Sequence, residues 1–528
     1  MASVQPPRLA PPDVGRPVVV AYDVGTSGVK AVVVAADGSV LASRVEPYGL
    51  LTPRPGWVEQ DLDAMIAALG AASRAVLASL SIAARDVVAV GLTAQMFSVV
   101  PVDADGHALR PMLSWLDQRS DAEAAAIVGR GGPDGGYAAL DAVLTGKDIA
   151  PKIAWLRRHD DDRRIAWYLD CKEAVAARLT GAAVTDPCGA SAYRLIDRAS
   201  GEWDRESCEL AGVPIDRLPR VEAATAVGGR LSAEGAALTG LLAGTPVVVG
   251  AGDVPAGQIG AGANEPGEAH LSLGTATYFG ITADRYLPDP ARRLGPLRHV
   301  MTDRWIVWLE TATGGGALAW FRRLMAGFAP RGAEPPDHAA IDRAVRAVEA
   351  EMDGLLFAPW LTGERVPLFD DAVRGAFLGV ALHHGAAHFA RAVMEGVACQ
   401  VATTLEYGLN YGVEPASIRT VGGGGIGAAW TSIIADTLGR PLAIVSEPQD
   451  AAARGAAACA LVGAGMADGL DTAVPARTER VVEPDPVRAE AARERLARFR
   501  GLHGALRTIA EPARGRTAAD EPVTAVPA

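Results

Sequence analysis

A short turn near residue 25 holds the residue types that bind phosphate in proteins. The stretch DVGTSG (residues 23–28) joins two apolar runs, and it carries two hydroxyls with Lys30 close by. Each backbone N–H of such a turn can point at an anionic oxygen without crowding from a Cβ atom. The alternative is a plain tight hairpin. The stretch fits neither a Walker A loop nor the G-x-G-x-x-G spacing of a dinucleotide fingerprint.

A lone carboxylate, Asp253, stands in a second candidate position. A β-branched run over residues 247–249 stops at Gly-Ala-Gly, and the small residues after Asp253 resume at a spacing that suits a helix packed on a sheet. A carboxylate at such a strand-to-helix turn lies at the end of an α/β sheet, where ligands usually bind. Aspartate is also a preferred N-cap, so a purely structural interpretation stays open.

Three later stretches rich in small residues repeat this pattern. Gly274-Thr275 separates two expected strands as a weak echo of the first turn, which suggests two similar cores facing each other across a cleft. Residues 311–316 (TATGGG) end a strand and open a helix, and backbone N–H groups at a helix N-terminus attract anions. Four glycines at 422–425 precede an amphipathic helix, where a bare backbone would let a flat base or sugar approach. A flexible turn is the alternative.

Residues 114–119 (SWLDQR) place an aromatic ring, a carboxylate and a guanidinium within one short segment. Such a group can hold a polyhydroxylated ligand, but a surface salt-bridge turn is at least as common. His384 and His388 are four residues apart, yet no glutamate stands between them and Gly385 interrupts the helix. They therefore do not predict a zinc site.

The elements that must position these residues alternate between strands and helices. Residues 18–22, 29–35 and 39–45 predict three antiparallel strands, the last two joined by an Asp-Gly turn. A buried strand is expected at 87–92, and short strands with polar turns over 182–245. Helices are expected over residues 62–80, with Asp61 as the N-cap, and over 150–159, 168–179, 388–407 and 486–509.

The size and composition limit the class of protein. A chain of 528 residues is too long for one core, so two large domains are expected, and 49% hydrophobic with 21% charged residues is typical of a soluble globular protein. A net charge of −12 argues against nucleic acid or an anionic membrane as partner. Five scattered cysteines without a C-x-x-C, no visible leader and no long apolar run favour a cytoplasmic protein with free thiols.

Taken in chain order, these elements resemble the FGGY family of carbohydrate kinases, within the actin, Hsp70 and sugar-kinase ATPase superfamily. The resemblance runs from about residue 18 to about residue 460. It is strongest over residues 375–395 (GAFLGVALHHGAAHFARAVME), which fit the family's C-terminal signature. Residues 363–367 (GERVP) and 56–61 (GWVEQD) are also family-like, whereas the upstream signature around Lys152 fits only in part. Among the branches of the family, the chain looks most like the xylulokinases.

The resemblance implies an α/β fold with two actin-like (ribonuclease H-like) ATPase domains around a central cleft. It implies an N-terminal domain over residues 17–245 and a C-terminal domain over residues 246–510, while residues 1–16 and 511–528 are expected to be disordered. The implied reaction moves the γ-phosphate of ATP, with Mg²⁺, to a hydroxyl of a small sugar or polyol. Neither nucleic acid nor a membrane is implied as partner, and a homodimer is compatible with the sequence.

Site residues follow from the positions that match the family's motifs. Asp253 matches the general base, and Asp23 together with Asp253 would organise Mg²⁺, partly through water. The expected ATP-binding residues are Asp23, Gly25, Thr26, Ser27, Lys30, Gly274, Thr275, Gly315, Gly316, Gly422, Gly423, Gly424 and Gly425. The expected sugar-binding residues are Gln95, Met96, Phe97, Trp115 and Asp253.

Departures from the family pattern concern the ligands. Phe97 and Val254 stand where xylulokinases usually carry His and Asn, and two lost hydrogen bonds of about 1 kcal/mol each are enough to change selectivity. We therefore expect D-xylulose or a related ketose or polyol, less hydroxylated or with its hydroxyls differently arranged, the alternatives being ribulose, fuculose, erythritol and glycerol-type polyols. Ile426-Gly427 replaces the usual Arg-Ser, which makes the expected adenine contacts less secure. A scaffold ATPase of the same superfamily and a catalytically silent sensor are the competing classes.

Overall fold

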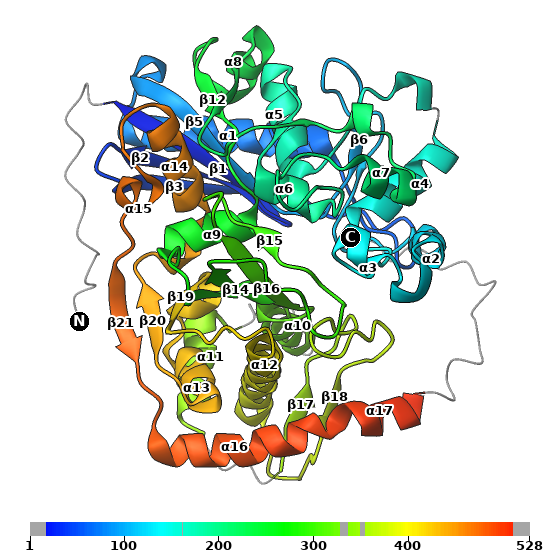
Figure 1. The fold of residues 1–528 in the computed structure, drawn as a ribbon. Coiled ribbons are helices and arrows are strands. Elements are labelled where there is room, and N and C mark those ends of the chain that lie inside the picture. The colour runs from blue at the N-terminus through cyan, green and yellow to red at the C-terminus, as the bar shows by residue number, and fades with distance from the viewer. Residues whose placement is uncertain (1–16, 161, 328–335, 349–353, 511–528) are drawn as a thin grey trace.

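The computed structural model describes residues 17–160, 162–327, 336–348 and 354–510. These residues form two lobes, each built on one large sheet, with α9 (Asp253–Ala261) between them (Figure 1). The expected α/β architecture is confirmed. The two terminal segments expected to be disordered, 1–16 and 511–528, lie outside the described residues.

The first lobe is organised by a six-stranded sheet with valine-rich central strands. In spatial order its strands are β11 (Val227–Arg230), β12 (Pro246–Val248), β5 (Val87–Ala94), β1 (Val18–Val24), β2 (Gly28–Ala35) and β3 (Val40–Pro47). Successive side chains of β1 point to opposite faces. Val20 and Tyr22 therefore join the core beneath α1 (Leu62–Leu80), whereas Val19 and Ala21 join the core beneath α14 (Ala451–Gly463). The antiparallel pairing predicted for β1, β2 and β3 is confirmed.

The second lobe repeats this plan. In spatial order its strands are β15 (Leu297–Arg298), β16 (Trp305–Thr311), β14 (Thr277–Ala283), β13 (Glu268–Leu273), β19 (Ser417–Val421), β20 (Leu442–Val445) and β21 (Thr478–Val482). As in the first sheet, one hairpin (β13–β14) is flanked by two parallel strands, β19 and β20. The helices of this lobe are α10 (Gly315–Ala326), α11 (His338–Arg346), α12 (Ala386–Leu409), α13 (Ala428–Leu438), α16 (Pro486–Arg500) and α17 (Leu502–Ala510). The helix expected over 388–407 is α12, and its apolar residues Val393, Val397 and Val401 lie in the core.

Smaller elements complete the molecule. The remaining helices are α2 (Asp121–Arg130), α3 (Tyr137–Leu140), α4 (Ile149–His159), α5 (Cys171–Thr180), α6 (Pro187–Ala192), α7 (Arg205–Ala211), α8 (Ala233–Thr239) and α15 (Leu470–Ala473). The short strand pairs are β4 (Glu59–Gln60) with β7 (Met112–Leu113), β6 (Val100–Val102) with β8 (Trp167–Leu169), β9 (Val184–Thr185) with β10 (Arg220–Val221), and β17 (Leu356–Ala358) with β18 (Ala376–Leu378). The segment 182–245 therefore contains three helices besides the short strands that were expected there.

Capping residues mark the helix ends where the sequence placed them, with one correction. Asp61 caps α1, because its carboxylate accepts the N–H groups of Asp63 (2.9 Å) and Ala64 (3.3 Å). The helix expected over 168–179 starts later than predicted. Tyr168 belongs to β8, which pairs with β6, and α5 begins only after its cap Asp170. Gly181 ends α5 as its C-cap, with φ of 77°.

The two lobes are joined by crossing elements rather than by one simple linker. β12 follows the boundary expected at residue 245, yet it pairs with β5 of the first sheet. In the same way α14 comes late in the chain but packs on β1 and β5, as well as on α9 (Figure 1). A Cβ atom on Gly260 of α9 would lie 1.8 Å from the carbonyl oxygen of Ala451, so the two helices touch through their backbones. The position of the domain boundary stays a prediction.

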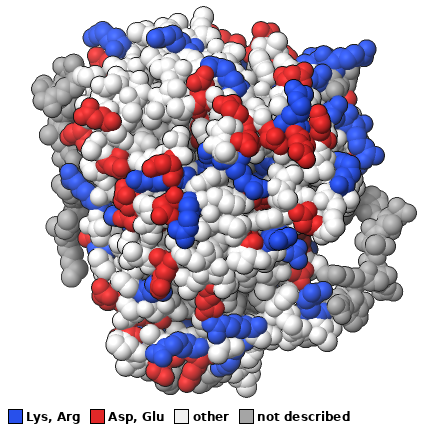
Figure 2. Space-filling view, in the orientation of Figure 1, with Lys and Arg blue, Asp and Glu red and all other residues white. Residues whose placement is uncertain are grey.

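Three features bear on the surroundings of the protein: its surface charges, a long apolar helix and its cysteines. Acidic and basic side chains are interspersed on the face drawn in Figure 2, without a continuous basic band there. α1 has the length and composition of a membrane-spanning helix, but its apolar residues Leu62, Ile66 and Leu69 are buried in the first core. All five cysteines are free and buried.

Candidate active site

One cavity of about 470 Å³ collects most of the residues singled out in the sequence. It lies where the β1–β2 turn of the first lobe and the β13–β14 turn of the second lobe meet the start of α9. The predicted residues that line it are Asp23, Gly25, Thr26, Ser27, Lys30, Gln95, Met96, Phe97, Trp115, Asp253, Gly274, Thr275, Gly422 and Gly423. The chain thus brings together residues up to about 400 positions apart in the sequence.

The first turn is held open by hydrogen bonds around Thr26. The Gly25 N–H donates to the Gly28 carbonyl (3.0 Å), and the Tyr48 hydroxyl donates to the Gly25 carbonyl. Gln60 Nε2 donates to the Thr26 carbonyl (2.9 Å), and Trp115 Nε1 donates to Thr26 Oγ1 (3.0 Å). Thr26 Oγ1 in turn donates to Gln95 Oε1 (3.2 Å). The turn is therefore a supported structure, and Trp115 and Gln95 belong to the same network.

The charges beside this turn are paired across the molecule. Lys30 Nζ lies 2.7 Å from Asp450 Oδ1 and also donates to the Gln449 carbonyl, so β2 is tied to the start of α14. Burial raises the pKa of Asp23, while the charge of Lys30 lowers it and that of Asp450 raises it. Gln449 lines the cavity, and neither it nor Asp450 was singled out from the sequence.

Asp253 is the first residue of α9, and Gly252 occupies the N-cap position. Its Oδ1 accepts the N–H of Val254 (2.9 Å), so the side chain satisfies part of the helix end and still faces the cavity. Burial raises the pKa of Asp253 to about 7, with further upward contributions from the charges of Asp23 and Glu310. A carboxyl group with such a pKa can exchange a proton near neutral pH, which a simple capping residue does not need.

The second sheet contributes side chains that sequence reasoning missed. Ser272, Tyr278 and Glu310 are neighbours across β13, β14 and β16, and all three line the cavity. Trp308 lies two residues before Glu310 and points to the same side, as strand geometry requires. The only signal in the sequence of β16 is that Glu310 is its one charged residue, directly after an apolar run.

Phe97 is held in an unusual backbone conformation at the edge of the cavity. Its φ of 65° lies in the left-handed region, which costs a bulky residue about 1–3 kcal/mol. The Asp170 carboxylate accepts the N–H groups of Phe97 (2.8 Å) and Ser98 (2.9 Å), and Lys152 Nζ donates to the Phe97 carbonyl (2.7 Å). The Phe97 ring stacks on Trp308 of the other lobe, with centroids 5.0 Å apart. Phe97 is therefore fixed between the two lobes.

A buried charge cluster anchors the segment between β12 and Asp253. Lys172 Nζ lies 2.9 Å from Glu173 Oε1 and donates to the carbonyl of Val249 (3.2 Å), four residues before Asp253. Asp186 Oδ1 lies 3.4 Å from the same ammonium group. Residues near the start of α5 thus fix both the Phe97 turn and the approach to Asp253.

The segment 114–119 combines both of its interpretations. Trp115 lines the cavity, whereas Asp117 and Arg119 form a fully buried ion pair with Nη2–Oδ2 of 2.7 Å. Asp117 Oδ2 also accepts the N–H of Val58 (2.6 Å), and the Arg119 guanidinium lies 3.8 Å from the centroid of the Trp57 ring. The charged pair is structural and buried, rather than on the surface, and it positions the segment that carries Trp115.

The other glycine stretches lie next to the cavity to different extents. The N–H groups of Gly314 and Gly316 donate to the Thr275 carbonyl, at 2.9 and 3.0 Å, and that of Gly315 donates to the Gly274 carbonyl at 2.7 Å. Gly315 and Gly316 therefore support the second turn, and neither is among the residues that line the cavity. Gly422 and Gly423 line it, whereas Gly424 and Gly425 are not among the lining residues. Direct contact of these four outlying residues with ATP stays a prediction.

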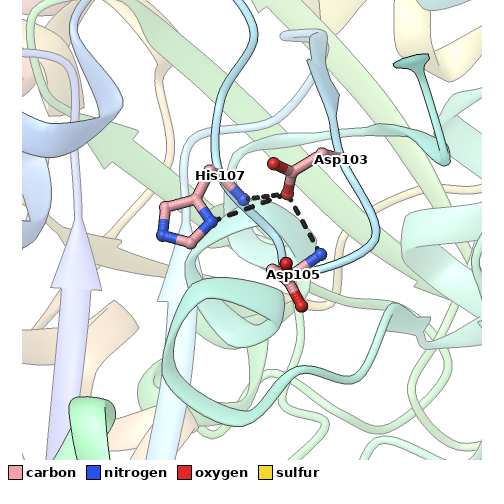
Figure 3. Close-up of side chains that lie close together, drawn as sticks. All are labelled: Asp103, Asp105 and His107. Carbon is pink, nitrogen blue, oxygen red and sulfur yellow. Dashed lines mark hydrogen bonds and ion pairs between the residues drawn. The ribbon is translucent and has the colours of Figure 1, made fainter.

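The carboxylates in the cavity fit a divalent cation. Asp23 and Asp253 line the same cavity from opposite elements, and the charge of Asp23 raises the pKa of Asp253. Two carboxylates that repel each other in an enclosed site provide the oxygen ligands that Mg²⁺ prefers. A separate acidic group, formed by Asp103, Asp105 and His107, has another explanation. Asp103 Oδ1 accepts the N–H groups of Asp105 (3.0 Å) and His107 (2.9 Å), so it closes a surface turn (Figure 3).

Comparison with known families identifies the class of protein. The model of the N-terminal domain of the FGGY family of carbohydrate kinases matches residues 18–260, and that of the C-terminal domain matches residues 269–464. The chain belongs to the FGGY family of carbohydrate kinases. It is therefore a sugar kinase, a phosphotransferase with an alcohol group as acceptor.

Individual relatives narrow this class. The xylulose kinase of Escherichia coli (strain K12) is 29% identical over 492 residues, which are 92% of this chain and 98% of that relative. The gluconokinase of Bacillus subtilis (strain 168) is 27% identical over 458 residues, 85% of this chain and 88% of that relative. The crystal structure of a "xyloylose kinase" from Brucella ovis, 30% identical, covers 93% of this chain and 100% of its own, with a TM-score of 0.80. Together they support an ATP-dependent, xylulokinase-like FGGY kinase over the competing class of a scaffold ATPase.

Proposed function

We propose that the protein transfers the γ-phosphate of ATP to a hydroxyl of D-xylulose or a related short ketose or polyol, with Asp253 as the general base. The observation that supports this proposal is the shared cavity, lined by Asp253 on one side and by the turn at Gly25 on the other. Phosphoryl transfer needs charge neutralisation, in-line positioning and one base, and no covalent apparatus.

Each group has a defined task in this proposal. A carboxylate oxygen of Asp253 accepts the proton of the attacking hydroxyl. The backbone N–H groups of the turns at Gly25 and Gly274 face the phosphates, and Lys30 lies beside them on β2. Asp23 and Asp253 would hold Mg²⁺, which when bound neutralises phosphate charge. The part of the cavity around Phe97, Trp308 and Asp253, where the sugar would bind, is called the acceptor end. The fixed stack of Phe97 and Trp308 excludes water from it.

The acceptor end is more apolar than that of a xylulokinase with His and Asn at the two departing positions. Phe97 stacks on Trp308, and Val254 is buried beside Asp253. A neutral side chain that offers no hydrogen bond tolerates a missing hydroxyl, whereas a hydrogen-bonding one rejects it. Among D-xylulose and related ketoses and polyols, we therefore expect a preference for acceptors with fewer or differently arranged hydroxyls at this end.

A coupled ADP assay over D-xylulose, D-ribulose, L-fuculose, erythritol and glycerol tests the proposal. At least one of them should raise ATP turnover well above the sugar-free rate, and Phe97→His with Val254→Asn should raise the D-xylulose efficiency about tenfold relative to the other acceptors. The kinase assignment of this site fails if no acceptor stimulates turnover. The idea of a less hydroxylated substrate fails if D-xylulose far exceeds all others in the wild type.

We further propose a cytoplasmic location and a homodimer. Five free, buried thiols suit the reducing cytoplasm, where the metabolites of a sugar kinase are found. A homodimer, which the sequence allows, is tested by light scattering at micromolar concentration, with a mass near twice 54.5 kDa as the supporting result.

A further inference from the structure

An ion pair lies inside the cavity on the side of the second lobe. Arg365 Nη1 is 2.6 Å from Glu310 Oε2, and both residues line the cavity. Glu310 is held by β16 beside Tyr278, and the Arg365 guanidinium lies 5.7 Å from the centroid of the Trp308 ring. The pair therefore borders the acceptor end, next to the aromatic stack formed by Phe97 and Trp308.

The loop that carries Arg365 is fixed to the same strand. Oε1 of the buried Glu364 accepts the N–H groups of Ala312 (2.7 Å) and Arg365 (2.8 Å). The Val366 N–H donates to the Glu310 carbonyl (3.2 Å). The backbone on both sides of Arg365 is therefore held at the end of β16, which places the Arg365 side chain beside Glu310.

Both cations that line the cavity are paired with carboxylates, so neither offers an unpaired positive charge to an acidic acceptor sugar. The charged lining residues are Asp23, Lys30, Asp253, Glu310 and Arg365. Each of the two cations is already bonded to a carboxylate, Lys30 to Asp450 at 2.7 Å and Arg365 to Glu310 at 2.6 Å. Nearby lysines are also engaged: Lys147 Nζ lies 2.7 Å from Asp371, and the buried Lys152 donates to two backbone carbonyls.

We propose that Glu310 makes the acceptor end selective for uncharged sugars and polyols, and that it excludes sugar acids such as aldonates. This inference rests on the proposed function of the cavity. An aldonate carboxylate would meet a guanidinium whose charge Glu310 already offsets, and it would face the charges of Glu310 and Asp253. A hydroxyl meets no such conflict, because it can accept from the guanidinium and donate to the carboxylate. The choice matters since relatives of this chain include both xylulose kinases and gluconokinases.

Binding of matched ligand pairs tests the selectivity without relying on turnover. Xylitol with D-xylonate and D-glucitol with D-gluconate differ within each pair only by oxidation of one terminal carbon. Isothermal titration of the wild type in the presence of a non-hydrolysable ATP analogue should show tighter binding of the polyol, by at least about tenfold. Glu310→Gln should shift the aldonate-to-polyol ratio of affinities at least about tenfold toward the aldonate, because it frees Arg365.

The control is Arg365→Gln, which removes the cation and should give no gain in aldonate binding. Thermal unfolding of each variant checks that it is folded, and the wild-type ratio tests the inference even where a variant is unstable. Equal or tighter binding of the aldonate by the wild type overturns the inference, as does an unchanged ratio in a folded Glu310→Gln variant.

Transfer is measured separately, so that the two proposals fail in different ways. If polyols bind with the expected preference but no sugar is phosphorylated, the proposed function is wrong and the charge selectivity stands. If an aldonate is the best phosphoryl acceptor, the selectivity is wrong and the kinase assignment stands.

Discussion

The turns of the two lobes have the same backbone plan and different chemistry. Each joins the hairpin strands at the centre of its sheet, β1–β2 in the first lobe and β13–β14 in the second. Two residues before the turn glycine stands Asp23 in the first lobe and Ser272 in the second. Five residues after it stand Lys30 and Phe279. The fold therefore supplies two similar cradles of backbone N–H groups, and only the first carries charge.

The two turns also differ in what supports them. Side chains brace the first turn, where Tyr48 bonds the Gly25 carbonyl and Gln60 bonds the Thr26 carbonyl. Backbone groups brace the second, where the N–H groups of residues 314–316 bond the carbonyls of Gly274 and Thr275. Substitution can therefore alter the support of the first turn more easily than that of the second. We expect the first turn to affect mainly the rate of phosphoryl transfer and the second to affect mainly the position of the phosphates.

The largest expected effect lies outside both turns, at the carboxylate between them. Asp253→Asn removes the proposed base and should lower kcat about 10³-fold, because general-base catalysis contributes about 10²–10⁴-fold. ATP affinity, measured by titration calorimetry, should stay within about threefold. Retained transfer activity would contradict the assignment of the base.

The asymmetry of the turns is tested by a matched pair of substitutions. Asp23→Asn should lower kcat/KM about 10²-fold, as expected when a charged group that stabilises the transition state is removed. Ser272→Ala, at the corresponding position of the second lobe, should change it less than about threefold. Steady-state kinetics with the best acceptor measure both, and equal losses would refute the division of roles.

The acid limb of the pH profile should report Asp253. Its pKa of about 7 means that the base is protonated, and kcat/KM falls about tenfold per pH unit, below that value. Glu310 contributes a charge that raises this pKa, so Glu310→Gln should move the limb to lower pH. Arg365→Gln frees the Glu310 charge from its partner and should move the limb to higher pH. A limb that does not move in either variant would show that another group titrates.

The smallest expected effect sharpens the contrast in support. Gln60→Leu removes the hydrogen bond to the first turn and the one that Gln60 Oε1 accepts from Gln95 Nε2 (2.7 Å), each worth about 1 kcal/mol, and should lower kcat/KM roughly fivefold. The thermal midpoint should fall slightly, because Gln60 is fully buried and its loss leaves Gln95 Nε2 without this acceptor. An unchanged kcat/KM would mean that side chains do not support this turn.

Local features of the sequence were enough to predict much of the fold. The valine runs at β1 and β2, the cap at Asp61 and the turn glycines depend on a few neighbouring residues, and they stand where expected. The helix expected from Tyr168 failed because β8 forms through pairing of Tyr168 with Pro101, which no local pattern reports. Most of the expected site residues line the cavity for the same reason that their motifs were recognisable: each is a short stretch around a turn.

The residues that were missed come from contacts between distant parts of the chain. Glu310 meets Arg365 across 55 positions, and Lys30 meets the Gln449 carbonyl, beside Asp450, across 419. Tyr278 reaches the site only because register places it between Ser272 and Glu310. An arginine after a glutamate in a loop, or a glutamate in a strand, carries no mark of its partner in a single sequence.

The contact between α9 and α14 has a consequence for how this enzyme could diversify. A methyl group on Gly260 would overlap the Ala451 carbonyl, and one on Gly455 would lie 2.0 Å from the carbonyl oxygen of Ala256. The close approach of α9 and α14 therefore depends on the absence of a Cβ atom at Gly260 and Gly455. A side chain at either position would push the two helices, and with them the lobes, apart. A change of substrate would therefore come from substitution of the residues that line the cavity, while the spacing between the lobes stays the same.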